Sequence, residues 1–116
     1  MLIGVPAETA TGETRVAVTP ETAKKLIAQG HTVRVQSGAG LRASATDEAY
    51  QAAGADITDA AGAFGADMVL KVRSPSAAEI AQMKPGTVLV GMLEPFNADG
   101  LQRLAAAHLT AFALEA

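Results

Sequence analysis

The chain has little of several residue types that define common protein classes. Its 116 residues include no cysteine and no tryptophan, and aromatic residues make up only 3% of them. The absence of cysteine excludes disulfides, thiol catalysis and cysteine-based metal sites. Few aromatic residues, a net charge of −3 and no basic stripe leave no surface typical of nucleic-acid binding. No apolar run approaches the roughly 18 residues that span a bilayer, and no cationic leader precedes the first run, so we expect a cytoplasmic protein.

Hydrophobic residues, in contrast, make up 49% of the chain, which indicates a globular protein with an aliphatic core. At this length the chain forms one domain at most. Five short runs are rich in Val, Ile and Leu and mostly lack apolar/polar alternation, as is typical of strands buried on both faces of a parallel sheet. These runs span residues 2–5, 31–36, 67–72, 87–92 and 110–114.

Segments with helical spacing separate these runs. Thr19-Pro20 is typical of a helix start, and Ser76 with Glu79 three residues later predicts a capping box. Shorter helices are expected over 47–53 and 60–64. The alternation predicts an α/β fold, a flavodoxin- or Rossmann-like doubly wound parallel sheet of about five strands. With the runs numbered along the chain, we expect the order 2-1-3-4-5.

Three charged residues are candidates for a ligand site. Arg15 and Lys71 each lie next to a run that reads as a buried strand, and Glu94 follows the fourth run. In a parallel sheet all three would lie toward the carboxyl ends of the strands, where open α/β sheets bind ligands. Two converging cations would suit an anionic or carbonyl-bearing ligand. The alternative is a surface Arg, a solvated loop Glu and a Lys whose head escapes past the strand end.

Two neighbouring features bear on that site. Either Glu8 or Glu13 could pair with the Arg15 guanidinium. If Lys71 binds an anion, Lys71→Met should disturb that anion more than the fold, because methionine keeps a similar apolar volume.

A glycine loop offers a competing cofactor site. Residues 38–43 match the pattern G-x-G-x-x-A after a strand. A dinucleotide fingerprint, however, needs a helix directly behind the glycines and an acidic residue about 20 positions later. Here the next helix is expected only near Asp47, so we interpret the loop as a structural turn. His31 and His108 are interpreted as solvated turn residues, and no metal-ligand cluster is apparent.

Five ordered segments carry a family resemblance. They are Ile3-Gly4-Val5-Pro6-Ala7-Glu8, Glu13-Thr14-Arg15-Val16-Ala17-Val18-Thr19-Pro20-Glu21, Gly38-Ala39-Gly40, Ala53-Gly54-Ala55 and Val69-Leu70-Lys71-Val72. The chain resembles the N-terminal domain shared by alanine dehydrogenase and the alpha subunit of proton-translocating NAD(P) transhydrogenase. The resemblance implies that residues 1–116 are a fragment of that domain, with the NAD-binding Rossmann domain following later in the chain.

The two branches of this family differ in chemistry. Alanine dehydrogenases are recognised by a His shortly after the fourth strand, where this chain has Leu93-Glu94-Pro95. Their Arg and Lys, which hold the substrate carboxylate and carbonyl, match Arg15 and Lys71. Hydride transfer between two nicotinamide rings needs no general acid or base, so the missing His favours the transhydrogenase branch. The segments Gly86–Val90 and Pro95–Asn97 also look more like that branch.

The resemblance therefore implies an enzyme part that holds one wall of a nicotinamide pocket, with candidates Arg15, Lys71 and Glu94 and no catalytic residue of its own. It implies an NAD site mostly outside these residues and NADP on another subunit. The implied partners are the rest of the alpha subunit, a membrane-embedded, NADP-binding beta subunit and a second copy, at the cytoplasmic side of the inner membrane. Two alternatives stay open: an alanine- or opine-type dehydrogenase with a displaced acid/base, and a non-catalytic flavodoxin-like binding module.

Overall fold

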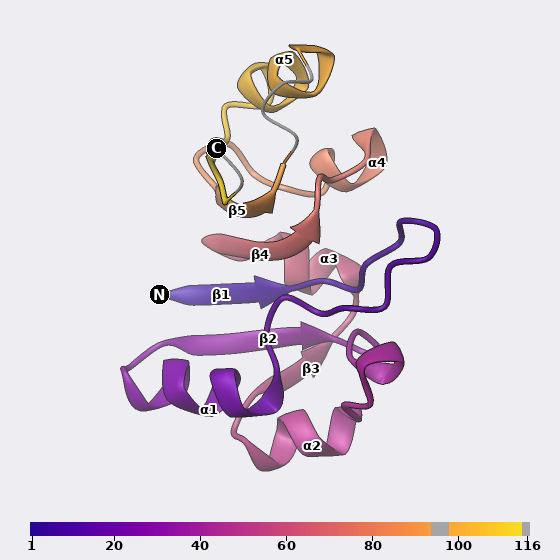
Figure 1. Ribbon diagram of the computed structural model, residues 1–116. Coiled ribbons are helices and arrows are strands. Elements are labelled where there is room, and N and C mark those ends of the chain that lie inside the picture. The colour runs from indigo at the N-terminus through magenta and orange to yellow at the C-terminus, as the bar shows by residue number, and fades with distance from the viewer. Residues whose placement is uncertain (94–97, 115–116) are drawn as a thin grey trace.

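The computed structural model describes residues 1–93 and 98–114 and shows a fully parallel, six-stranded sheet with helices on both faces (Figure 1). The strands are β1 (Leu2–Val5), β2 (Thr32–Gln36), β3 (Asp56–Thr58), β4 (Met68–Arg73), β5 (Val88–Met92) and β6 (Thr110–Ala113). The helices are α1 (Pro20–Ala28), α2 (Asp47–Ala52), α3 (Ala60–Phe64), α4 (Ala77–Ile80) and α5 (Ala98–Ala106), with a 3₁₀ turn, η1, at Leu41–Ala43. None of the helices described is long and apolar enough to cross a membrane.

The strand order is β3-β2-β1-β4-β5-β6. The predicted runs correspond to β1, β2, β4, β5 and β6, and their expected relative order is confirmed. The sheet has one strand more than predicted, because β3 pairs with the outer side of β2. With only three residues and a single aliphatic side chain, Ile57, this edge strand carries no apolar run for a sequence pattern to detect.

Local sequence signals start the helices where predicted. The Thr19 side chain accepts a hydrogen bond from the Thr22 backbone N–H at 3.2 Å, and Pro20 occupies the first helical position of α1. Ser76 and Glu79 form the predicted capping box at the start of α4. These short-range contacts fix the residues at which α1 and α4 begin.

Two core clusters lie on opposite faces of the sheet. One packs Ala23 of α1 and Tyr50 of α2 against β1 and β2. The other packs Phe64 of α3 and Leu104 of α5 against β4 and β5. This division follows from right-handed crossovers, which place helices on one face while the chain moves outward from β1 and on the other face after it returns to β4.

On the face of the sheet that carries α1 and α2, helices cover the strands β1, β2 and β3 but leave the surface of β5 and β6 open. Phe112 of β6 is 57% exposed, and Leu114, just after β6, is 69% exposed. Half-buried Val90 and Met92 of β5 line a groove on the same side of the sheet. An apolar strip of sheet is therefore open to solvent in the part of the chain that is described.

Candidate functional site

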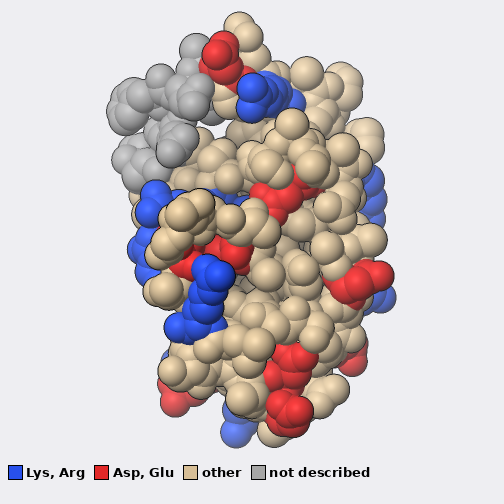
Figure 2. Space-filling view, turned by 90° about the vertical axis from the view of Figure 1, so that its right-hand side faces the viewer, with Lys and Arg blue, Asp and Glu red and all other residues tan. Residues whose placement is uncertain are grey.

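Charged side chains gather where β1 and β4 end. These two strands are adjacent, and the chain connections leave them in opposite directions, which makes this point the topological switch of the sheet. The strand arrows of Figure 1 point toward this edge, and Figure 2 looks onto it, with acidic and basic side chains side by side. The charged residues involved are Glu8, Glu13, Arg15, Lys71, Arg73 and Glu79.

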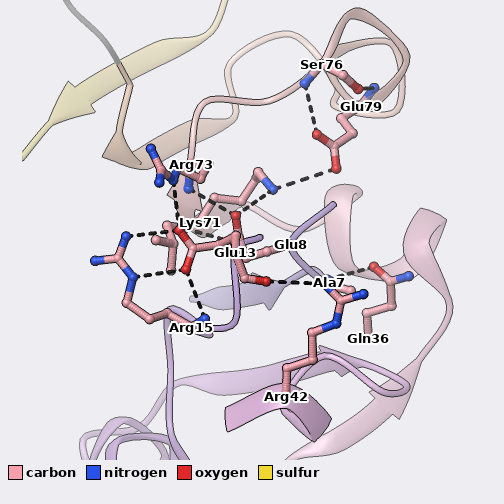
Figure 3. Close-up of polar contacts among 11 residues, drawn as sticks. Ala7, Glu8, Glu13, Arg15, Gln36, Arg42, Lys71, Arg73, Ser76 and Glu79 are labelled. Atoms are coloured by element: carbon pink, nitrogen blue, oxygen red, sulfur yellow. Dashed lines mark hydrogen bonds and ion pairs between the residues drawn. The ribbon is translucent and has the colours of Figure 1, made fainter. Parts of the chain in front are cut away.

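Lys71 is buried in this cluster, with only 1% of its side chain exposed. Its Nζ lies 3.2 Å from Glu8 Oε1 and 3.7 Å from Glu79 Oε2 (Figure 3). A buried ammonium is costly unless it is paired, and here two carboxylates pair it. Of the two ways in which a strand Lys can be accommodated, the structure therefore uses pairing, and the head does not reach water.

Glu8 is equally buried, with 2% of its side chain exposed. Besides Lys71, its carboxylate accepts the backbone N–H of Val72 at 2.9 Å and that of Arg73 at 3.0 Å. The β4–β5 register shifts here, between Leu70 and Arg73. At this irregularity the backbone amides of two successive β4 residues, Val72 and Arg73, donate to the same carboxylate, that of Glu8.

A second carboxylate, Glu13, joins the loop after β1 to β4. Its Oε1 accepts hydrogen bonds from Arg15 Nη2 at 2.9 Å and from Arg73 Nε at 2.8 Å. Its Oε2 accepts hydrogen bonds from Nε and from the backbone N–H of Arg15. The hydrogen bonds from Arg15, followed by that from Arg73, hold the pKa of Glu13 well below its usual range. Glu13 is thus ionised at neutral pH and fixes the direction of the Arg15 side chain, which is itself 57% exposed.

A groove of about 480 Å³ opens beside this cluster. Arg15 and Lys71 both line it, as do Val16 and Ala17 and the open apolar residues of β4 and β5. The ammonium of Lys71, however, is bound to Glu8 and Glu79 rather than left free. Arg15 is therefore the cation that the groove offers to an anionic or polar ligand. The third candidate, Glu94, lies outside the described residues.

A hollow of about 410 Å³ lies on the other side of Lys71. Residues 9–11, Ser74–Ser76, Arg73, Glu79 and Arg103 line it. Its lining is mostly polar, whereas the groove is mostly apolar. Arg73 and Arg103 bring positive charge to this hollow, and Glu79 brings negative charge.

The glycine loop after β2 is arranged as a closed turn. The Asp47 carboxylate accepts Ser37 Oγ at 2.6 Å and the Gly38 N–H at 2.9 Å, and these hydrogen bonds lower the pKa of Asp47. A Cβ on Gly40 would lie 2.7 Å from the Ala45 carbonyl oxygen, so this glycine serves internal packing. The η1 turn separates the glycines from α2. These contacts favour the structural interpretation of the loop, because the Gly38 amide is bound to the chain's own Asp47 carboxylate.

Both histidines lie away from the groove. His31 immediately precedes β2 and His108 precedes β6, which places them toward the amino ends of the strands. No histidine is among the residues that line the groove within the described part of the chain. The titratable groups along the described groove are Arg15 and Lys71, and Arg15 is the one available to contact a ligand because Lys71 is paired with two carboxylates.

Sequence reasoning missed the roles of three residues. Of the two carboxylates that the sequence offers to Arg15, Glu13 binds it, whereas Glu8 pairs with Lys71. The sequence indicates only a helix cap at Glu79 and gives no signal for the contact of Arg73 with Glu13. Because the contacts of Glu8 and Arg73 join residues about sixty positions apart, no local pattern could have revealed them.

Comparison with known proteins matches nearly the whole chain. The family model described as "Alanine dehydrogenase/PNT, N-terminal domain" matches residues 4–116. The NAD(P) transhydrogenase subunit alpha of Haemophilus influenzae is 39% identical over 100% of the chain, and the alanine dehydrogenase of Bacillus subtilis is 44% identical over 77%. The crystal structure of transhydrogenase from Sinorhizobium meliloti superposes with a TM-score of 0.96 at 40% identity over 99% of the chain.

The chain spans only part of these proteins: 23% of the Haemophilus subunit, 24% of the Bacillus enzyme and 35% of the Sinorhizobium chain. The family resemblance expected from the sequence motifs is confirmed, and so is the α/β fold. The matches include both branches of the family.

Proposed function

Because the chain belongs to the alanine dehydrogenase/PNT N-terminal domain family, we propose that it is the N-terminal part of the NAD(H)-binding alpha subunit of a proton-translocating NAD(P) transhydrogenase. In this proposal it forms one wall of a nicotinamide cleft and supplies no acid or base. The full enzyme transfers hydride between NADH and NADP⁺ and couples the transfer to proton movement. NAD is held mainly by the following part of the subunit and NADP by another subunit.

The observation that carries the proposal is the chemistry of the groove. Oxidising an amino acid requires a proton-transfer group beside the hydride step, whereas transfer between two nicotinamide rings requires none. Arg15 and Lys71 are the titratable residues along the described groove, and Lys71 is already paired with two carboxylates. His31 and His108 lie toward the opposite edge of the sheet. The open apolar surface beside Arg15 is suited to a planar ring with a polar substituent.

The direct test is an activity comparison on the full-length protein that contains this chain, assembled with its partner subunits. We expect it to reduce an NAD analogue, such as acetylpyridine adenine dinucleotide, with NADPH as the hydride donor. We expect no L-alanine-dependent reduction of NAD⁺ above background. The reverse pattern would assign the chain to the dehydrogenase branch and refute the proposal.

The second candidate is an alanine- or opine-type dehydrogenase with a displaced acid/base. The 44% identity to the Bacillus subtilis alanine dehydrogenase favours it, as does the presence of both Arg15 and Lys71. In that case Arg15 would bind a substrate carboxylate, and Arg15→Met would raise KM for pyruvate. The remaining alternative is a flavodoxin-like module without catalysis, which predicts neither activity.

The proposed assembly follows from the same assignment. The partners would be the rest of the alpha subunit, a membrane-embedded, NADP-binding beta subunit and a second copy of the alpha subunit. The chain would then lie at the cytoplasmic side of the inner membrane, attached through those partners. Co-purification of the full-length alpha subunit with a membrane fraction only when the beta subunit is co-expressed would test this placement.

A further inference from the structure

The switch-point crevice between β1 and β4 contains a complete set of donors for a carboxylate. Two backbone amides, of Val72 and Arg73, and the Lys71 ammonium converge on one position. Successive backbone N–H groups of this kind form anion-binding concavities, and the crevice at a switch point is where open α/β sheets place ligands. The Glu8 carboxylate occupies that position (Figure 3).

The backbone around these donors is built for this contact. Strands β1 and β4 pair only through Ile3↔Met68 and Gly4↔Val69, so the β1 chain separates from β4 before Lys71. The Glu8 side chain bridges the resulting gap. On the other side of β4, a Cβ on Gly91 would lie 2.2 Å from the Lys71 carbonyl oxygen, so the close approach of β5 to the irregular part of β4 requires a glycine.

The Lys71 ammonium and the Glu8 carboxylate are also buried, so this ion pair is shielded from solvent. Only 1% of the Lys71 side chain and 2% of the Glu8 side chain are exposed. Glu79, the other partner of Lys71, lies 3.7 Å from its Nζ and is bound through Oε1 to the Ser76 N–H of its own helix cap. Removing the Glu8 carboxylate would therefore leave two amide donors unsatisfied and an ammonium with one distant partner.

We propose that this crevice is a carboxylate-binding site that the chain fills with its own Glu8, so that Glu8 is an intramolecular ligand and not merely a surface acid of the loop after β1. The site is consequently closed to external anions in the native protein, and among the described residues the groove beside it presents Arg15 as its available cation. This assignment rests on the contacts that Glu8 makes with Lys71, Val72 and Arg73. Its ligand class is a small monocarboxylate, whose two oxygens match the three donors.

The experiment is chemical rescue. Glu8→Ala removes the carboxylate and leaves space for formate or acetate. We expect the variant to be destabilised in urea, and 100 mM formate to restore stability. With a dissociation constant of about 10 mM, this concentration would shift the unfolding equilibrium about tenfold toward the folded state. Sodium chloride at the same ionic strength should not produce the shift, because chloride offers one acceptor in place of two.

The matched control is Asp59→Ala. The Asp59 carboxylate also accepts a backbone N–H, from Gly62 at 2.8 Å, but it lies at an exposed helix cap without a buried cation. Formate should not rescue this variant. Equal rescue of both variants, or equal rescue by chloride, would show a general salt effect and overturn the proposal.

A second readout keeps the proposal testable if Glu8→Ala does not fold. Glu8→Gln keeps the shape of the side chain and one oxygen acceptor but removes the charge. In the native protein Lys71 should resist acetylation by an amine-reactive ester while exposed Lys84 reacts, as measured by peptide mass spectrometry. In Glu8→Ala, or in Glu8→Gln if the former is unfolded, the Lys71 rate should rise at least tenfold relative to Lys84. An unchanged ratio would show that Glu8 is not the ligand that holds Lys71.

Discussion

Replacement of Lys71 by methionine tests most directly what holds the β1 loop to β4. Methionine keeps a similar apolar volume but leaves the Glu8 and Glu79 carboxylates without their ammonium. At 3.2 Å and an effective dielectric constant of about 20, the attraction between Lys71 and Glu8 is about 5 kcal/mol before the cost of desolvation. Removing one partner of a buried ion pair costs about 3–5 kcal/mol net.

The expected loss lies near the lower end of that range, about 3 kcal/mol, because Glu8 keeps its two backbone amides. The sequence led us to expect that Lys71→Met disturbs a bound anion more than the fold, and the burial of Lys71 adds a measurable cost to the fold itself. A domain with a typical stability of about 5–15 kcal/mol should still fold, so the change is measurable by urea denaturation followed by circular dichroism.

Two comparisons make the measurement decisive. Lys84→Met removes the exposed pair with Asp67, in which both side chains are about half exposed, and should cost about 1 kcal/mol or less. In a double-mutant cycle, Lys71→Met and Glu8→Gln should be non-additive by about 1 kcal/mol or more. If Lys71→Met costs no more than Lys84→Met, or if the Lys71 and Glu8 effects simply add, the buried-pair reasoning is wrong.

Three further predictions concern other parts of the molecule. Hydrogen bonds, chiefly from Arg15, hold the pKa of Glu13 below its usual value of 4.5, and hydrogen bonds, chiefly from Ser37, hold the pKa of Asp47 below its usual value of 3.8. In acid the unfolded chain therefore binds more protons than the folded chain. Their stabilisation is present above about pH 4.5 and should be lost as the pH falls, with a weaker dependence in Glu13→Gln by thermal unfolding between pH 6 and pH 2. Tyr50→Phe should cost about 1–2 kcal/mol in urea, because buried Tyr50 donates to the Val18 carbonyl at 2.6 Å and the substitution leaves that oxygen unpaired; an unchanged midpoint would contradict this. In the proposed function the isolated 116 residues offer only one wall of a cleft, and the Gly38 amide of the glycine loop is bound to Asp47. They should therefore bind NADH only at millimolar concentration or weaker, about 4 kcal/mol or less, and micromolar saturable binding in titration calorimetry would identify the loop as a cofactor site.

Much of the fold could be predicted from the sequence because its signals are local. Continuous aliphatic runs such as residues 67–72 are typical of strands buried on both faces, and the structure confirms five of them in the expected order. The capping residues Thr19 and Ser76 act within three or four positions of themselves. The ordered motifs also indicated the family, and the comparisons confirm it. The strand β3 escaped because three residues are too few to form a pattern.

The sequence by itself determined where five of the six strands form, and it predicted that Arg15 and Lys71 lie toward the carboxyl edge of a parallel sheet. Only the tertiary structure decided which charges meet there. Glu8 and Lys71 are 63 positions apart, and they touch because β1 and β4 are neighbours at the switch point. The energetic effect of a pair depends on the distance between the charges and on their burial. Losing one partner costs little when the pair is exposed to water, but it costs several kcal/mol, about 3–5, when the remaining charge is buried. Neither the distance nor the burial is encoded in a local stretch of residues, which is why the sequence identified Lys71 but not Glu8 and Glu79, the carboxylates that bind it.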